Sequence, residues 1–125
     1  EKEDIREHNM HAEYFSISLN SLRKLQSFKR SRKPIICLGT TSVRVLETLA
    51  LNNFEKNSGW TDLFIYPPYN FRIVQGLLTN FHLPKSTLLM MVSAFYGREK
   101  LLEAYRAAVE EKYRFFSYGD CMLIL

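Results

Sequence analysis

The segment that decides the fold is Thr79-Asn80-Phe81-His82-Leu83-Pro84-Lys85-Ser86-Thr87-Leu88-Leu89-Met90-Met91, where an apolar strand gives way to an apolar helix. Its proline disfavours helical backbone in the residue before it, so the helix begins later. Ser86 or Thr87 can cap this helix, and a helix apolar almost all round belongs inside a domain. Its first N–H groups then face a loop where His82 and Lys85 could bind an anion or a polar small molecule. The alternative is a plain strand-to-helix turn with good capping chemistry.

The composition indicates one globular domain. The chain has 125 residues, of which 46% are hydrophobic and 14% aromatic, which suffices for a core and is too apolar for a disordered chain. The apolar run around Leu88–Val92 is too short to span a membrane. The acidic start Glu1–Asp4 is unlike a secretory signal. Because the sequence has no initiator Met, we expect a piece of a longer chain or a processed product.

Charge and cysteine content narrow the possible partners. The net charge is +4, and basic residues gather in one short stretch: Arg23, Lys24, Lys29, Arg30, Arg32 and Lys33. This cluster is either a solvated helix end with its loop or a patch that contacts phosphates. Cys37 and Cys121 lie in apolar runs and are predicted to be small core residues in a reducing cytoplasm. No CxxC or Cys/His zinc pattern is present in the sequence.

A strand, a tight turn and a helix follow one another in the first half of the chain. Pro34–Leu38 is a short apolar run, Gly39–Ser42 is the turn, and a helix is expected from Val43 to about Leu51. This is half of a parallel α/β unit, and ligands of such sheets bind beyond the carboxyl ends of the strands.

Further elements follow from hydrophobic periodicity. They are a strand within His11–Ile17, a helix capped by Ser18 or Asn20 and running to about Lys29, strands at Leu63–Tyr66, Phe71–Val74 and Gly76–Phe81, helices from Thr87 to about Phe95 and from Arg98 to about Lys112, and a strand at Cys121–Leu125. Residues 52–61 are predicted to be a polar loop around Trp60, and Gly97 is predicted to end a helix. Closely spaced strands favour antiparallel pairing, so the predicted fold class is α/β, with a mixed sheet and helices packed on it, in one domain over residues 1–125.

The block His8-Asn9-Met10-His11-Ala12-Glu13 combines two imidazoles with a carboxylate. In a strand, His11 and Glu13 point the same way, which suits a hydrogen-bonded acid/base pair, although a structural surface strand explains them as well. A metal site would need further ligands, and His82 is the only other histidine, so no metal is predicted.

Two more blocks offer polar groups beside expected strand ends. Gly39-Thr40-Thr41-Ser42-Val43-Arg44 places hydroxyls and N–H groups at a helix start, although it is neither GxGxxG nor a Walker loop. Gly39 permits an unusual backbone angle or a close approach, and Arg44 could hold a carboxylate through two hydrogen bonds. Asp120 follows Ser117-Tyr118-Gly119. It is either part of a β-turn or a carboxylate that binds a ribose or an amine beside an aromatic surface.

These blocks, taken in order, resemble the S-adenosylmethionine:tRNA ribosyltransferase-isomerase family over nearly the whole chain. The matching segments are His8–Glu13, Gly39–Arg44, Thr79–Leu88, Gly97–Glu99 and Tyr113–Asp120. The Asn-Phe-His-Leu-Pro-Lys-Ser-Thr block is highly specific, whereas the His/Glu block and the Gly-Thr-Thr-Ser turn would only be suggestive alone. Family members are longer, so the resemblance implies the C-terminal portion of a catalytic domain, without the N-terminal part and an inserted β-rich domain. Pro68 is a departure, since the family more often has Gly there.

The resemblance implies a role in queuosine biosynthesis. Such an enzyme transfers and isomerises the ribosyl group of S-adenosylmethionine onto a 7-aminomethyl-7-deazaguanine base at the tRNA wobble position. The product is epoxyqueuosine, and adenine and methionine leave. The cosubstrate would be S-adenosylmethionine and the partner tRNA, in the cytoplasm, with no metal and no membrane. The full-length enzyme is expected to be a monomer.

This chemistry requires identifiable groups. A sulfonium acidifies the adjacent C5′ hydrogens, so a base is needed, and departing adenine needs a proton donor. We expect His82 or His11 to act as base or acid, with Glu13 orienting His11. The methionine carboxylate needs an arginine or a helix N-terminus, and a flipped tRNA base needs an aromatic surface. The groups expected to bind the cosubstrate are Gly39, Thr40, Thr41, Ser42, Arg44, Lys85, Ser86 and Asp120.

Two other functions are compatible with the sequence. A basic module that only contacts tRNA would lose affinity steeply with salt and leave the cosubstrate untouched. A folding unit that lacks half of its pocket would be inert, although its parent is an enzyme. The enzyme hypothesis gains if His11, Thr41, His82 and Asp120 line one cleft.

Overall fold

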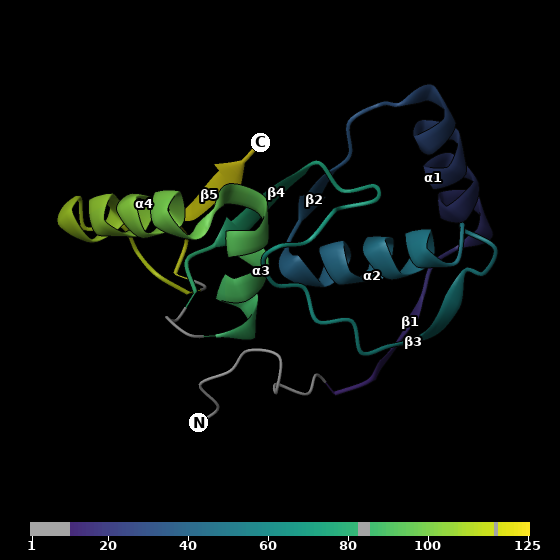
Figure 1. Cartoon of the computed structure of the whole chain (residues 1–125), viewed down its shortest axis with the longest axis horizontal. Coiled ribbons are helices and arrows are strands. Elements are labelled where there is room, and N and C mark those ends of the chain that lie inside the picture. The colour runs from purple at the N-terminus through teal and green to yellow at the C-terminus, as the bar shows by residue number, and fades with distance from the viewer. Residues whose placement is uncertain (1–10, 83–85, 117) are drawn as a thin grey trace.

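Three short strands form the central sheet of the molecule (Figure 1). The computed structural model describes residues 11–82, 86–116 and 118–125. Across the sheet the strands are ordered β2 (Ile36–Leu38), β4 (Gly76–Asn80) and β5 (Cys121–Ile124). β2 and β4 are parallel, whereas β4 and β5 are antiparallel. The predicted fold class, a mixed sheet with helices packed on it, is confirmed.

One face of this sheet carries the hydrophobic core. Helices α2 (Thr40–Leu51) and α3 (Thr87–Tyr96) pack on this face; in Figure 1, α3 lies in front of β4 and α2 runs below the strands. Buried side chains from both layers meet there, among them Cys37, Val43, Leu77, Val92 and Ile124. The predicted strand-turn-helix unit is therefore present, and α2 begins at Thr40, directly after the turn residue Gly39.

A separate two-stranded ribbon packs beside α2. β1 (Glu13–Ser16) and β3 (Ser58–Thr61) are antiparallel, with Tyr14 opposite Trp60. The prediction that residues 52–61 are entirely loop was therefore wrong. A 2.6 Å hydrogen bond between the buried hydroxyls of Thr48 and Thr61 attaches the ribbon to α2. The polar composition of β3 hid this strand, because its pairing depends on β1 more than 40 positions earlier.

The remaining helices follow the expected pattern of caps. α1 (Leu19–Ser31) is capped by Ser18, whose hydroxyl accepts the Ser21 N–H at 3.0 Å. Ser86 caps α3, and Gly97, with a φ of 91°, separates it from α4 (Arg98–Glu110). Within the described parts of the chain, no helix has the length and apolar character needed to cross a membrane.

The segment between β3 and β4 departs most from the prediction. Leu63–Tyr66 and Phe71–Val74 were predicted to be strands, and the structure has neither as a strand. For Phe71–Val74 the cause is Glu47, a fully buried residue of α2. Its carboxylate accepts the backbone N–H groups of residues 72–74 at 2.9–3.1 Å and the Tyr69 hydroxyl at 3.0 Å. The N–H groups that a strand would give to a neighbouring strand are thus satisfied by one side chain.

The two cysteines have different surroundings. Cys37 is buried, as predicted, and burial together with the nearby Glu47 charge raises the pKa of its thiol to about 11. Cys121 is exposed, so its prediction as a core residue was wrong. Strand alternation explains the difference, because Met122 and Ile124 are the β5 residues that face the helices.

We predict that Glu47→Gln destabilises the fold by about 3 kcal/mol. The amide has one acceptor oxygen and places an NH₂ group against N–H donors, so at least two donors lose their partner. Urea unfolding at pH 7 measures the effect, with the exposed Glu103→Gln as the control. Equal stability of both variants would show that the carboxylate does not hold this segment.

Candidate functional site

A hollow of about 260 Å³ lies at the carboxyl ends of the parallel strands β2 and β4. The residues lining it are Leu38, Gly39, Leu78, Thr79, Asn80, Gly119 and Cys121. Three sequence blocks therefore converge: the turn after β2, the end of β4 and the residues around the start of β5. This is the edge of an α/β sheet at which ligands bind.

Backbone and amide hydrogen bonds hold the three blocks together. The Gly39 N–H donates to the Leu78 carbonyl at 2.9 Å, which fixes the turn on β4. The Asn80 side-chain amide donates to the Asp120 carbonyl at 3.3 Å, which fixes the β5 approach on the same strand. The hollow therefore has a rigid floor built on β4.

The first turn of α2 opens beside this floor. Gly39 occupies the position before the helix with a φ of 87°, and no side chain caps the helix there. Ser42 donates its hydroxyl to the Leu38 carbonyl at 3.2 Å, whereas Thr40 is half-buried and Thr41 exposed. Uncapped N–H groups and the partial positive charge of the helix end favour a negatively charged group at this position.

His82 is anchored at two points just after β4. Its Nε2 lies 2.8 Å from the Thr79 hydroxyl, and its backbone N–H donates to the Tyr105 hydroxyl at 2.7 Å. Burial lowers the pKa of the imidazole, so His82 is neutral at pH 7. His82 is not among the residues that line the hollow. Thr79 does line it, and its hydroxyl contacts the His82 ring. The sequence did not single out Tyr105, because its place in the apolar stripe of α4 indicated only a core residue.

Glu13 and Arg44 form a pair away from this position. Arg44 Nη1 lies 3.5 Å from Glu13 Oε1, and Arg44 Nε donates to the Leu63 carbonyl at 3.2 Å. Arg44 Nη2 is buried and, among the described residues, has no hydrogen-bond partner. The expectation that Glu13 orients His11 is not supported, since the carboxylate contacts Arg44; His11 itself is exposed.

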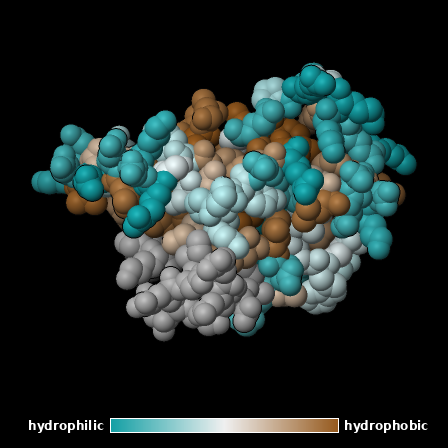
Figure 2. Space-filling view, viewed as in Figure 1, coloured by the Kyte–Doolittle hydropathy of each residue, from teal (hydrophilic) through white to brown (hydrophobic). Residues whose placement is uncertain are grey.

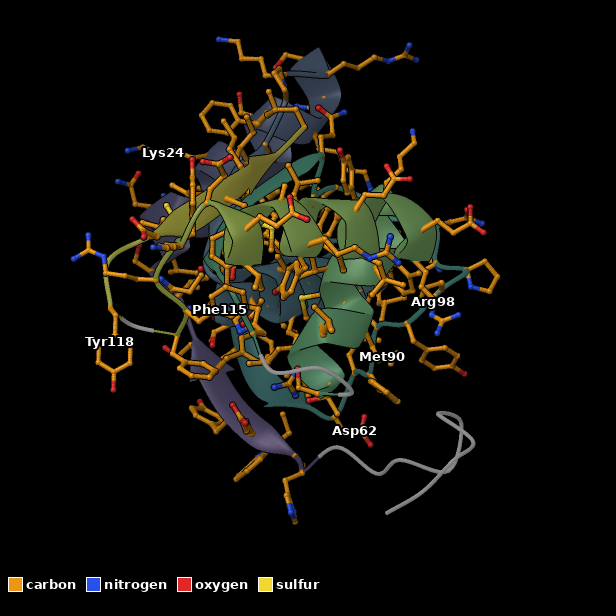
Figure 3. All side chains as sticks on the ribbon, turned by 90° about the vertical axis from the view of Figure 1, so that its left-hand side faces the viewer. Lys24, Asp62, Met90, Arg98, Phe115 and Tyr118 are labelled. Atoms are coloured by element: carbon orange, nitrogen blue, oxygen red, sulfur yellow. The ribbon has the colours of Figure 1, made fainter. Side chains whose placement is uncertain are left out.

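The other predicted residues occupy structural positions. The Asp120 carboxylate accepts the Arg114 backbone N–H at 2.6 Å, and this hydrogen bond and the Arg114 side chain lower the pKa of Asp120. The Asp120 carboxylate is thus engaged by Arg114. The Ser86 hydroxyl accepts the Leu89 N–H at 3.1 Å as the helix cap. Lys85 lies outside the described residues. The Tyr118 side chain points away from the body of the protein in Figure 3, and its ring is exposed to solvent.

Metal ligands are sparse in this structure. Residues 11–82, 86–116 and 118–125 contain no group of three or more His, Cys, Asp or Glu side chains that could hold a metal ion.

Known proteins resemble the chain over almost its entire length. The family model described as queuosine biosynthesis protein matches residues 1–124. The S-adenosylmethionine:tRNA ribosyltransferase-isomerase of Sulfurihydrogenibium sp. (strain YO3AOP1) is 58% identical over 123 residues, covering 98% of this chain and 36% of that relative. The protein of the same name from Halothermothrix orenii is 50% identical over 125 residues, covering 98% of this chain and 37% of the relative. The chain thus spans little more than a third of the length of these curated relatives.

A solved structure gives the same picture of the fold. The crystal structure of S-adenosylmethionine tRNA ribosyltransferase from Thermotoga maritima superposes with a TM-score of 0.82 at 50% sequence identity. The match covers 90% of this chain and 40% of that one.

We predict that the stability of the chain falls as the pH is lowered from 7 to 5, and that His82 contributes to the loss. In the unfolded chain the His82 imidazole has a pKa of about 6.5. In the folded chain burial lowers this pKa, so the ring resists protonation. The unfolded state therefore gains protons first, which destabilises the fold. An NMR titration of the His82 ring should give a midpoint below about 6.5. A midpoint at or above that value would contradict the prediction.

Proposed function

The chain belongs to the queuosine biosynthesis protein family, and we propose that it supplies part of the active site of a cytoplasmic S-adenosylmethionine:tRNA ribosyltransferase-isomerase. The reaction would transfer and isomerise the ribosyl group of S-adenosylmethionine onto a 7-aminomethyl-7-deazaguanine base at the tRNA wobble position. Adenine and methionine would leave, and epoxyqueuosine would result. The full-length enzyme would work as a monomer without a metal.

The observation that supports this proposal is the hollow at the carboxyl ends of β2 and β4. It unites residues from three blocks that the resemblance singled out, although these blocks lie some 40 residues apart in sequence. The hollow is somewhat smaller than the roughly 300–1,000 Å³ that ligand pockets commonly enclose. It therefore suits one portion of the cosubstrate.

His82 is the proposed proton-transfer group. Its Nε2 is engaged by Thr79, so Nδ1 is the ring nitrogen proposed to take a C5′ proton from the sulfonium. A lowered pKa suits a base, because the imidazole is already neutral at pH 7. Thr79 and Tyr105 hold the ring and the backbone of His82 in place.

The start of α2 is the proposed contact for the methionine carboxylate. Its uncapped N–H groups flank Gly39 at the rim of the hollow, and Thr40 and Thr41 add hydroxyls there. Lys85 is proposed to add positive charge. The contacts of Arg44 with Glu13 and Leu63 favour a different role for this arginine, in which it ties β1 to α2.

A tRNA-binding module is the second candidate function, and the surface of α1 favours it. The basic residues Arg23, Lys24, Lys29, Arg30 and Arg32, together with Lys33, are all exposed. Figure 2 shows hydrophilic residues over this helix. Such a patch could contact phosphates whether or not the hollow binds a cosubstrate.

The role of His82 is testable in a chimaera in which residues 1–125 replace the matching part of the Thermotoga maritima relative. We expect His82→Ala to slow a single turnover by about 10²–10⁴-fold, the range of general acid–base catalysis. Glu103→Gln, on the exposed side of α4, is the control and should keep the full rate. His11→Ala is tested in parallel. Unchanged rates for both histidine variants would end the proposal of a histidine base.

Adenine release from labelled S-adenosylmethionine separates the two candidate functions. The enzyme proposal expects the chimaera to release adenine when precursor tRNA is present. A pure RNA-binding module would instead hold tRNA with a steep salt dependence and leave the cosubstrate intact. The latter outcome, with a folded chimaera, would replace the enzyme proposal.

A further inference from the structure

The side chain of Arg114 places a guanidinium group beside the hollow. Gly119 lines the hollow, and a Cβ atom at Gly119 would lie 3.2 Å from Arg114 Nη2 and 3.4 Å from its Cζ. Gly119 also has a φ of 118°, a backbone conformation that residues with a side chain rarely adopt. Glycine at this position therefore lets the guanidinium pack directly against the wall of the hollow.

The loop that carries Arg114 is attached to the end of β4, the floor of the hollow. The Phe116 N–H donates to the carbonyl of Phe81, which follows β4, at 3.0 Å. The Phe115 ring stacks on the buried Phe81 ring at a centroid distance of 4.9 Å. Phe115 and Tyr118 mark this loop on the left-hand side of Figure 3. Two kinds of contact thus hold Arg114 in place relative to the hollow.

The Asp120 carboxylate engages one edge of Arg114 and leaves the other edge free. Its Oδ2 accepts the Arg114 backbone N–H at 2.6 Å and lies 3.4 Å from Nε. These contacts lower the pKa of Asp120, so the carboxylate is ionised at pH 7. Within the described parts of the chain, Nη1 and Nη2 of Arg114 have no hydrogen-bond or ion-pair partner. Their N–H groups form a fork that matches the two oxygens of a carboxylate.

Arg44, the arginine that the sequence suggested for a carboxylate, lacks such a free edge. Its side chain is 9% exposed and contacts Glu13 and the Leu63 carbonyl. The Arg114 side chain is 67% exposed, so an anion can reach it from solvent.

We propose that Arg114 binds the carboxylate of the cosubstrate S-adenosylmethionine at the hollow, and that Asp120 is the positioning residue that holds this arginine. Gly39 lines the same hollow, so the uncapped N–H groups at the start of α2 share it with the guanidinium. Those N–H groups supply hydrogen bonds and a partial charge, whereas Arg114 supplies a full charge. The inference rests on the proposed function and adds the residue that selects a cosubstrate with a carboxylate.

The test compares S-adenosylmethionine with its decarboxylated analogue, which lacks only the group that Arg114 is proposed to bind. Equilibrium dialysis of the full-length chimaera without tRNA measures both dissociation constants and requires no turnover. We expect Arg114→Ala to weaken binding of S-adenosylmethionine on the order of 10–100-fold, the effect of losing a charge-assisted pair, and to leave the analogue within about twofold. A merely structural role of Arg114 would weaken both ligands alike.

Two further variants refine this comparison. Arg114→Lys should give an intermediate loss for S-adenosylmethionine alone, because lysine keeps the charge but not the fork. Lys100→Ala is the control; it removes one positive charge from the exposed side of α4 and should keep both affinities. If Arg114→Ala is unfolded by circular dichroism, Arg114→Lys decides by the same comparison.

The positioning role of Asp120 requires a double-mutant cycle. Asp120→Asn should weaken S-adenosylmethionine less than Arg114→Ala does, and should cause no further loss in the Arg114→Ala background. An equal loss in both backgrounds would show that Asp120 acts independently and would refute its positioning role.

Unchanged affinity of Arg114→Ala for S-adenosylmethionine, or an equal loss for both ligands, would overturn the proposal. So would a loss of tRNA affinity with a reduced salt dependence and intact cosubstrate binding, because the arginine would then contact a phosphate. Adenine release separates this inference from the proposed reaction. A wild type that prefers S-adenosylmethionine to the analogue but releases no adenine with precursor tRNA would refute only the reaction. An active wild type whose KM is unchanged in Arg114→Ala would refute only the carboxylate site, and a wild type that binds neither ligand would refute both.

Discussion

The structure depends on the buried carboxylate of Glu47. One side chain from the middle of α2 accepts hydrogen bonds from three consecutive backbone N–H groups and from Tyr69. The chain therefore reaches β4 through an irregular segment whose last N–H groups, at residues 72–75, are all hydrogen-bonded. Because β4 is the central strand and the floor of the hollow, this carboxylate positions both the sheet and the candidate site. Burial, with the Glu47 charge adding to it, raises the pKa values of the neighbouring Cys37 thiol and Tyr69 hydroxyl.

Local signals in the sequence predicted the parts of the fold that local chemistry determines. Serine at position 86 is a preferred helix cap, and glycine at position 97 is a preferred helix end. The apolar run, glycine turn and helix pattern between Pro34 and Leu51 are equally local signals. The prediction of a strand at Phe71–Val74 was wrong because a distant residue determines the structure there. Its alternation is real, but the partner of its N–H groups is a carboxylate about 25 positions away, which periodicity cannot detect.

The candidate site shows the same division. The α/β rule predicted a ligand site beyond the carboxyl ends of the strands, where the Gly39 turn falls, and the hollow lies there. The ion pair of Arg44 with Glu13 could not be predicted, because it joins a helix to a ribbon whose second strand was not recognised. The prediction that Cys121 is a core residue was wrong, because the sequence of an apolar strand does not reveal that one of its faces is uncovered.

The cross-strand pair of Tyr14 and Trp60 has a practical consequence for spectroscopy. Trp60 is the sole tryptophan of the chain, is 69% exposed and contacts the tyrosine ring edge-on at a centroid distance of 5.5 Å. Intrinsic fluorescence therefore reports on the ribbon, whereas far-ultraviolet circular dichroism is dominated by the helices. Coinciding melting curves from the two signals would indicate that the ribbon and the helices unfold as one cooperative unit.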